Sequence, residues 1–217
     1  DSRVAFSPDG KQVAFWRGVP QKQQNLLVVF DLAGSRERVL ATLDEAERFQ
    51  GPPAWSPDGK RIAWIFNHGE TAWVEVRSEN GTRQRLQTEA GFAYWPMFSA
   101  DSRSALFIHE NPRQPPDVWL AALEDGHLSQ LTDSLPAELK SVEFIMPETV
   151  TYPSLDGTPI PAILYKPKNA GAHSPAVVVI HGGPAWHLAF YWNPVMSYMA
   201  ARGWTVIATT RRPDEAA

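Results

Sequence analysis

The sequence AVVVIHGGP, at residues 176–184, decides how the rest of the chain is interpreted. Five apolar residues, four of them β-branched, run without a polar interruption into a turn with two glycines. Such a run predicts a strand buried on both faces, as in the centre of a parallel sheet. Glycines at the carboxyl end of that strand let the backbone approach a reacting group, where one N–H aimed at an oxyanion contributes roughly 3 to 4 kcal/mol. The alternative is a tight turn that needs glycine only for its conformation.

Composition restricts the class of protein. The 217 residues are 43% hydrophobic and 20% charged, so we expect a sizeable core. The net charge of −4, with no basic cluster larger than Arg211-Arg212, argues against nucleic acid as a partner. The absence of cysteine excludes disulfides, thiolate catalysis and Cys-ligated zinc, and the six histidines show no metal-site spacing, so no cofactor or metal is expected.

The two ends of the sequence leave the compartment open. No apolar run approaches the roughly 18 residues that a membrane span needs, so no membrane partner is expected. The opening DSRVAF, residues 1–6, does not resemble a signal peptide and begins in a strand-like pattern. We therefore expect the natural protein to begin further upstream, with the cytoplasm and the periplasm both open as locations.

The first part of the chain repeats itself. VAFSPDGKQVAF at 4–15 matches PAWSPDGKRIAW at 53–64, and PMFSADSRSALF at 96–107 is a weaker copy. The corresponding serines are 49 and 43 residues apart, a period typical of propellers or solenoids. The aromatic residue that precedes each turn is expected to pack between neighbouring repeats. These residues are Phe6, Trp55 and Phe98.

Each copy predicts a four-stranded antiparallel sheet. Ser-Pro-Asp-Gly joins two strands in a hairpin, because Pro presets φ, Asp bonds to the backbone and Gly accepts a positive φ. An apolar third strand and a short fourth strand follow, separated by a turn near Gly34, Gly81 or Gly126. Four strands in each repeat form one propeller blade. The predicted third strands are Leu26–Phe30, Trp73–Val76 and Val118–Ala121, and the fourth are Arg38–Thr42, Gln84–Thr88 and Leu128–Thr132.

The pattern changes near residue 140. Asp156-Gly157, between two apolar runs, predicts a hairpin. After residue 184, Asn193 as N-cap, Pro194 at the first position and Gly203 beyond the end predict a short helix. Strand, glycine turn, helix and strand predict a right-handed βαβ unit with parallel strands. The apolar helix face is expected to carry Val195, Met196, Met199 and Ala200, and the second buried strand to cover Trp204–Thr210.

Together the two halves resemble the prolyl oligopeptidase family. The blades resemble those of TolB-like propellers, and they precede PETV at 147–150, the hairpin Asp156-Gly157, YKP at 165–167 and HGGP at 181–184. This order is most similar to acylaminoacyl-peptidase and dipeptidyl-peptidase-like members. The resemblance implies a multi-domain fold, with a partial β-propeller of three four-stranded antiparallel blades at 1–139 and the truncated N-terminal portion of an α/β-hydrolase domain at 140–217.

The resemblance also implies a function. Family members are serine peptidases that cleave short peptides through a Ser nucleophile and an acyl-enzyme, with a propeller that filters substrates by size. Carried over to this sequence, Gly183 would supply one oxyanion N–H, while His181 and Gly182 would shape the loop. The aromatic stretch after Pro184 would help to cover the site, and Arg211 or Arg212 would stand for an arginine of the next family motif.

The sequence departs from the family in one respect. No glycine is followed two positions later by serine, so the chain contains no Gly-x-Ser-x-Gly elbow, and the triad is expected to lie further on. Three blades are also too few to close a ring of four to eight, so we expect a fragment that is inactive alone. Two alternatives stay open, namely a non-catalytic propeller that binds protein or peptide with a degenerate hydrolase remnant, and an esterase. Oligomeric state and cleavage preference are also open.

Overall fold

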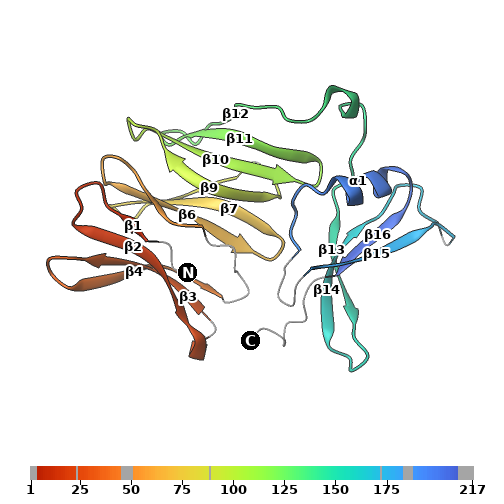
Figure 1. Ribbon diagram of the computed structural model, residues 1–217, viewed down its shortest axis with the longest axis horizontal. Helices are drawn as coiled ribbons and strands as arrows, with labels where there is room; N and C mark the ends of the chain where they lie inside the picture. The colour runs from red at the N-terminus through yellow and green to blue at the C-terminus, as the bar shows by residue number, and fades with distance from the viewer. Residues whose placement is uncertain are drawn as a thin grey trace. The chain divides into compact units, whose positions relative to one another are not determined.

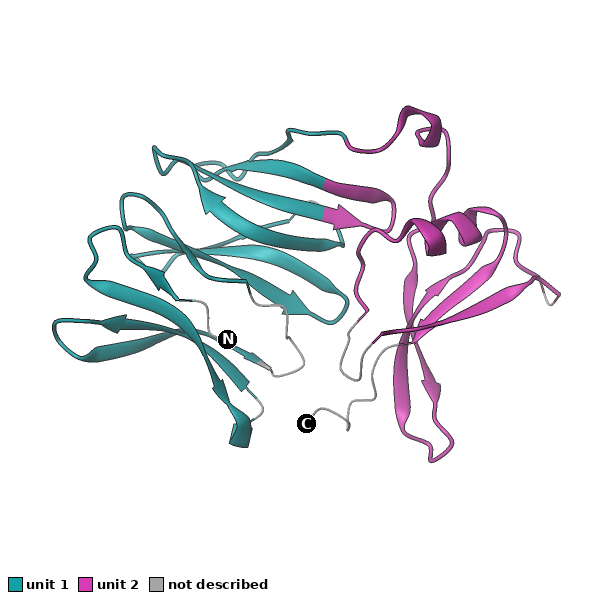
Figure 2. Ribbon diagram, viewed as in Figure 1, with its two compact units in different colours: residues 1–109, 117–133 teal, residues 110–116, 134–217 magenta. Residues whose placement is uncertain are grey.

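The computed structural model describes residues 4–22, 24–44, 51–87, 89–171, 173–182 and 188–209. The chain forms two compact units (Figure 2). Unit 1 consists of Asp1–His109 and Asp117–Asp133, and unit 2 of Glu110–Pro116 and Ser134–Ala217. Each unit is described by itself below.

The first sheet of unit 1 is a four-stranded antiparallel sheet with the order β1-β2-β3-β4 (Figure 1). A register shift between Leu27 and Val28 marks a β-bulge where β3 pairs with β4. These strands are the four that the first sequence copy predicts. Their bounds are β1 Ala5–Phe6, β2 Gln12–Val19, β3 Gln24–Asp31 and β4 Arg36–Asp44.

The second sheet of unit 1 contains the other two copies. Strands β5 to β8 form one antiparallel set and β9 to β12 follow in chain order, while a single parallel bridge, Ala72 to Phe92, joins β7 to β9. The sequence therefore predicts the strand content of all three repeats correctly. The bounds are β5 Ala54–Trp55, β6 Arg61–His68, β7 Thr71–Ser78, β8 Arg83–Leu86, β9 Phe92–Phe98, β10 Ser104–Asn111, β11 Gln114–Ala122 and β12 Leu128–Gln130.

The three repeat turns are built alike. In the first, the hydroxyl of Ser7 donates to the Asp9 carboxylate at 2.7 Å, and that carboxylate accepts the N–H of Lys11 at 3.0 Å. The same pair of bonds recurs from Ser56 to Asp58 and from Ser99 to Asp101. The position after each Asp has a positive φ, occupied by Gly10 at 69°, Gly59 at 71° and Ser102 at 60°. These bonds satisfy the backbone where the hairpin turns.

Two core clusters hold unit 1 together. One cluster joins the first sheet to β6, with Trp16, Leu27 and Trp64 among its buried members. The other joins strands of the second and third copies around Ile65 and Phe107. Trp55 and Phe98 pack against these clusters as predicted, but the expectation for Phe6 is wrong. Its side chain is 64% exposed, because the described part of the chain places no apolar face over it.

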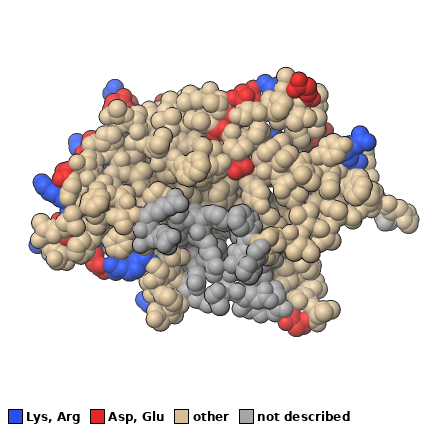
Figure 3. Space-filling view, in the orientation of Figure 1, with Lys and Arg blue, Asp and Glu red and all other residues tan. Residues whose placement is uncertain are grey.

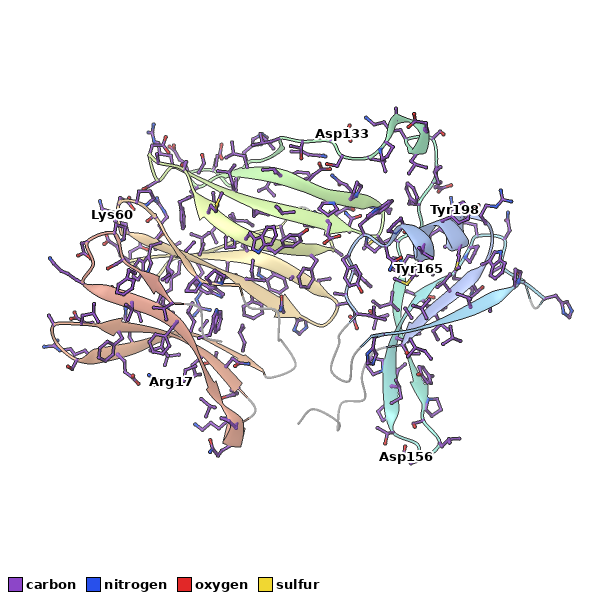
Figure 4. The ribbon with its side chains drawn as sticks, viewed as in Figure 1. Arg17, Lys60, Asp133, Asp156, Tyr165 and Tyr198 are labelled. Carbon is purple, nitrogen blue, oxygen red and sulfur yellow. The ribbon has the colours of Figure 1, made fainter. Side chains whose placement is uncertain are left out.

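The described part of unit 2 contains a four-stranded mixed sheet with the order β13-β14-β16-β15 and the helix α1. Strands β13 and β14 form the predicted hairpin at Asp156-Gly157, where Gly157 has φ 84°, and Asp156 lies at its tip (Figure 4). Strand β16 is antiparallel to β14 and parallel to β15, as the βαβ pattern predicts. The bounds are β13 Glu148–Pro153, β14 Pro159–Tyr165, β15 Ala176–Ile180, α1 Pro194–Ala201 and β16 Thr205–Thr209. A short 3₁₀ turn lies at Ala137–Leu139, and another, at Pro20–Lys22, belongs to unit 1.

Both strands of the parallel pair are buried on one face only, so the prediction of two-sided burial is wrong. Val177 and Val179 of β15 pack into the core of the unit, whereas Val178 is 62% and Ile180 76% exposed. Burial also alternates along β16, which begins at Thr205 after a partly exposed Trp204. The cause is position, because β15 lies at the edge of this sheet and nothing in the described ranges covers its outer face. Thr210 lies outside the described residues.

Helix α1 follows its predicted capping but buries a different stripe. Asn193 accepts the N–H groups of Val195 and Met196 at 3.1 and 3.0 Å, and Gly203 ends the helix with φ 90°. The buried residues are Met196, Ser197 and Ala200, which share one face at helical spacing. Val195, predicted on the apolar face, is 60% exposed, since it points away from the sheet on which the helix packs.

Among the described residues, the distribution of charge and hydropathy does not indicate a particular binding surface. Acidic and basic side chains are interspersed on the face shown in Figure 3. No helix in the described part of the chain has the length and apolar character needed to cross a membrane.

Candidate functional site

The candidate site lies where β15 ends in unit 2. The parallel register pairs Ile180, the last residue of β15, with Thr209 of β16. His181 and Gly182 follow directly, so the first two residues of the His-Gly-Gly motif lie at the carboxyl end of a parallel strand. This is where α/β sheets place ligand sites. Gly183, the predicted oxyanion donor, lies outside the described residues, as do Pro184 and Trp186.

His181 has a local hydrogen-bond geometry. Its side chain is half-buried, and its Nδ1 lies 3.4 Å from the carbonyl oxygen of the neighbouring Gly182. This contact links the imidazole to the backbone of the loop itself. Such a position suits a residue that shapes the turn, which is the role expected for His181 in the sequence.

Gly182 has open space where a side chain would be. A Cβ at this position would meet no atom of the described residues within 4 Å, and Gly182 is not among the described glycines with a positive φ. The described residues therefore give neither a left-handed backbone nor a close neighbour as a reason for glycine at 182. This observation weakens the alternative in which the first glycine is present only for turn conformation.

The segment that follows the loop is packed into the core. Leu188, Ala189 and Phe190 are buried, and Leu188 and Phe190 belong to the cluster that also contains Tyr165 of β14. Phe190 is thus a core residue, whereas Trp186, the first aromatic residue of the stretch expected to cover the site, lies outside the described residues. Burial raises the pKa of the Tyr165 hydroxyl, and the nearby Tyr191 adds to the shift. Figure 4 shows Tyr165 on β14 beneath α1 and Tyr198 on the exposed side of that helix.

Three further contacts around this segment could not be predicted from the sequence. The carboxylate of Glu110 accepts the backbone N–H of Trp192 at 2.8 Å, and the ring of Trp192 packs edge-on against Phe144 with centroids 5.0 Å apart. The hydroxyl of Ser197 donates to the carbonyl oxygen of Pro112 at 3.0 Å. Glu110 and Pro112 belong to the segment Glu110–Pro116 of unit 2, more than 80 residues before their partners.

Other candidate sites in the described ranges are weaker. A cavity of about 410 Å³ lies between residues 142–145, residues 167–169 and the end of α1, and its lining includes neither His181 nor Gly182. No group of three or more His, Asp or Glu side chains among the described residues is arranged to hold a metal ion. The carboxyl end of β15 is therefore the best candidate that the geometry offers.

Two of three comparisons with known proteins find relatives of this chain. No family model matches the chain. Dipeptidyl-peptidase 5 of Porphyromonas gingivalis is 33% identical over 224 aligned residues, which cover 97% of this chain and 31% of that protein. The chain thus spans about a third of the length of its curated relative.

Solved structures show the same fold. A puromycin-hydrolyzing peptidase of Mycobacterium tuberculosis matches with a TM-score of 0.65 and 18% identity, covering 95% of this chain and 40% of that one. A structure from a study of two prolyl endopeptidases matches with a TM-score of 0.57 and 13% identity, covering 96% and 37%. At such identities the likeness concerns the fold alone, but together with the 33% identical relative it leads to one conclusion. This chain is a relative of the prolyl oligopeptidase-family peptidases.

Proposed function

We propose that this chain is part of a serine peptidase that cleaves short peptides, and that residues 140–217 begin its α/β-hydrolase domain after the propeller portion at 1–139. The observation that carries the proposal is the parallel pair β15–β16, with α1 between the strands in sequence and His181-Gly182 leaving the end of β15. This is the strand, turn, helix and strand arrangement from which open α/β sheets build their sites.

In the proposed mechanism the loop stabilises charge. A serine outside these 217 residues attacks the peptide carbonyl, and the carbonyl oxygen becomes an oxyanion. The N–H of Gly183 donates to that oxyanion, and the second donor is the N–H that follows the nucleophile. His181 and Gly182 hold the loop in shape, and no described atom lies within 4 Å of where a Cβ of residue 182 would be. No cofactor takes part.

The substrate class follows from the relatives. The names of the curated relative and of the solved structures refer to peptidases, and dipeptidyl-peptidase 5 is the most informative of them because of its 33% identity. We therefore propose short peptides as substrates, in preference to simple esters.

The test uses the natural protein that carries this chain and, separately, the 217-residue chain. The natural protein is expected to hydrolyse chromogenic dipeptide amides faster than acyl esters and to be labelled by a serine-directed fluorophosphonate. The 217-residue chain is expected to show neither turnover nor labelling, because it has no elbow serine.

Each contrary result has a distinct meaning. A natural protein without labelling or turnover would replace the peptidase proposal with a non-catalytic binding protein. Faster turnover of esters than of amides would replace it with an esterase. Labelling of the 217-residue chain would contradict the placement of the nucleophile outside it.

A further inference from the structure

The segment Leu188–Trp192 directly precedes the N-cap of helix α1 and follows the His-Gly-Gly loop after residues 184–187, and its position is fixed from two sides. On one side, Leu188 and Phe190 are buried in the core cluster of the sheet, and Ala189 between them is buried as well. On the other, the peptide N–H of Trp192 points to the carboxylate of Glu110, with 2.8 Å between nitrogen and Oε2. Trp192 directly precedes the N-cap Asn193, so its N–H lies outside the helical hydrogen-bond pattern and needs another acceptor.

The acceptor is a charged group from a distant part of the sequence. Glu110 is 82 residues before Trp192 and is partly buried, so the bond is charge-assisted and shielded from water on one side. A second bond joins the same two parts of unit 2. Ser197, fully buried in α1, donates its hydroxyl proton to the carbonyl oxygen of the buried Pro112.

The backbone before the His-Gly-Gly loop and the backbone after it are therefore held by different hydrogen bonds. The backbone before His181 is held by the parallel ladder that pairs Ile180 with Thr209. The backbone after the loop is held by Glu110 at Trp192 and, one turn into the helix, by Pro112 at Ser197. A donor that stabilises a transition state must be fixed before the reaction, because its reorganisation would otherwise add to the barrier.

We propose that Glu110 is a positioning residue for the His-Gly-Gly loop, acting through the backbone N–H of Trp192. The inference rests on the proposed function, since it assigns the loop a part in turnover. Glu110 touches no substrate in this role. It fixes where the chain that leaves the loop begins, and the Ser197–Pro112 bond supports the same segment.

The test compares three variants of the natural protein. Glu110→Ala removes the acceptor, Glu110→Gln keeps an acceptor oxygen without the charge, and Glu143→Ala is the matched control, because Glu143 is exposed and pairs with Lys168 instead. We expect Glu110→Ala to lower kcat by about 10- to 100-fold, the scale of a slightly misplaced catalytic group, with KM changed less than about threefold. Glu110→Gln should restore most of kcat, and Glu143→Ala should match the wild type.

A second readout does not depend on activity. Hydrogen–deuterium exchange of a peptide that covers residues 188–196 should be faster in Glu110→Ala than in wild type and Glu143→Ala, with the global unfolding midpoint unchanged. A wild-type kcat in Glu110→Ala, or unchanged hydrogen–deuterium exchange, would overturn the positioning role of Glu110 but leave the proposed function in place. A general loss of folding in both Glu110 variants would make Glu110 a structural residue and also overturn it. An inactive wild-type protein would overturn the proposed function and this inference together.

Discussion

The hydroxyl of Ser102 accepts a hydrogen bond from the backbone N–H of Asp58 at 3.0 Å, so the turn of the third repeat is tied to the turn of the second. Arg61 adds to this link by donating to the carbonyl oxygen of Ser102 at 3.1 Å. Ser102 is 4% exposed and stands where the first two copies have glycine. The third copy thus accepts a left-handed φ of 60° on a serine and gains a bond between repeats.

This relationship predicts a ranking of two variants. Ser102→Ala keeps a side chain at positive φ and leaves the Asp58 N–H without its acceptor, so we expect a loss of about 1 to 3 kcal/mol in the free energy of unfolding. Ser102→Gly loses the same bond but relieves the strained φ, so it should be about 1 kcal/mol more stable than the alanine variant. Urea denaturation of the 217-residue chain measures both.

The control for this comparison is Ser35, which also has a positive φ, at 49°, but lies exposed in a turn. The free energies of unfolding of Ser35→Gly and Ser35→Ala should differ from each other by a similar amount. Neither Ser35 variant should show the loss that the missing bond between repeats causes in both Ser102 variants. If Ser102→Ala were as stable as wild type, the bond to Asp58 would contribute nothing to the packing of the second and third repeats.

The repeat turns also predict a dependence of stability on acid. The hydroxyl of Ser99 and then the N–H of Arg103 hold the pKa of Asp101 below its ordinary value, and the first turn does the same for Asp9 through Ser7 and Lys11. A folded pKa below the unfolded one means that these carboxylates stabilise the fold above about pH 4, and that the contribution is lost as pH falls through the folded pKa.

We expect the melting temperature of Asp101→Asn to lie below that of wild type at pH 6 and to converge with it as pH falls well below 4. Ser99→Ala removes the main cause of the shift, so its melting temperature should depend less on pH below about 4 than that of wild type. Parallel melting curves for Asp101→Asn and wild type at every pH would contradict the role of the charge.

His109 predicts a second pH effect, at a higher pH. Burial lowers the pKa of its imidazole, while the carbonyl oxygen of Glu89, 3.3 Å from Nε2, opposes the shift in part. The unfolded chain therefore binds a proton at His109 more readily than the folded chain, so stability is complete above about pH 6.5 and declines as pH falls below it. Denaturation midpoints between pH 7.5 and 5 should show this decline, and His109→Gln should flatten it. An equal slope in the variant would assign the decline to other groups.

Local patterns explain why so much of the fold could be predicted. The Ser-Pro-Asp-Gly turns fix the start of each hairpin by bonds within six residues, and the strands on either side alternate in a way that the sequence displays directly. The same holds for the hairpin at Asp156-Gly157 and for the capping of α1 by Asn193. In each case the residues that form the structure are neighbours in the chain.

The errors share a different cause, because they concern what lies opposite a residue in space. The run AVVVI predicts burial on two faces, but β15 has a neighbour on one side and a cover on one face only. The contact of Glu110 with Trp192 was not predicted, because in the sequence Glu110 is one polar residue in the alternating pattern of a half-buried strand. Its partner lies 82 residues away. A single sequence carries no local signal for such a contact.

The last prediction separates the two glycines of the candidate loop. Gly182 has no positive φ, and no described residue lies within 4 Å of where its Cβ would be, so Gly182→Ala should leave the unfolding midpoint of the natural protein unchanged or raise it slightly. Gly183 carries the proposed oxyanion N–H, and a bulky side chain there would displace that donor. Gly183→Val is therefore expected to lower kcat/KM by on the order of 100-fold or more, the scale of losing one donor, with little change in thermal unfolding. Near-normal turnover would remove Gly183 from the site. A collapse of folding equal to the loss of turnover would instead make the second glycine a structural requirement of the turn, and the comparison with Gly182→Ala under the same conditions distinguishes the two outcomes.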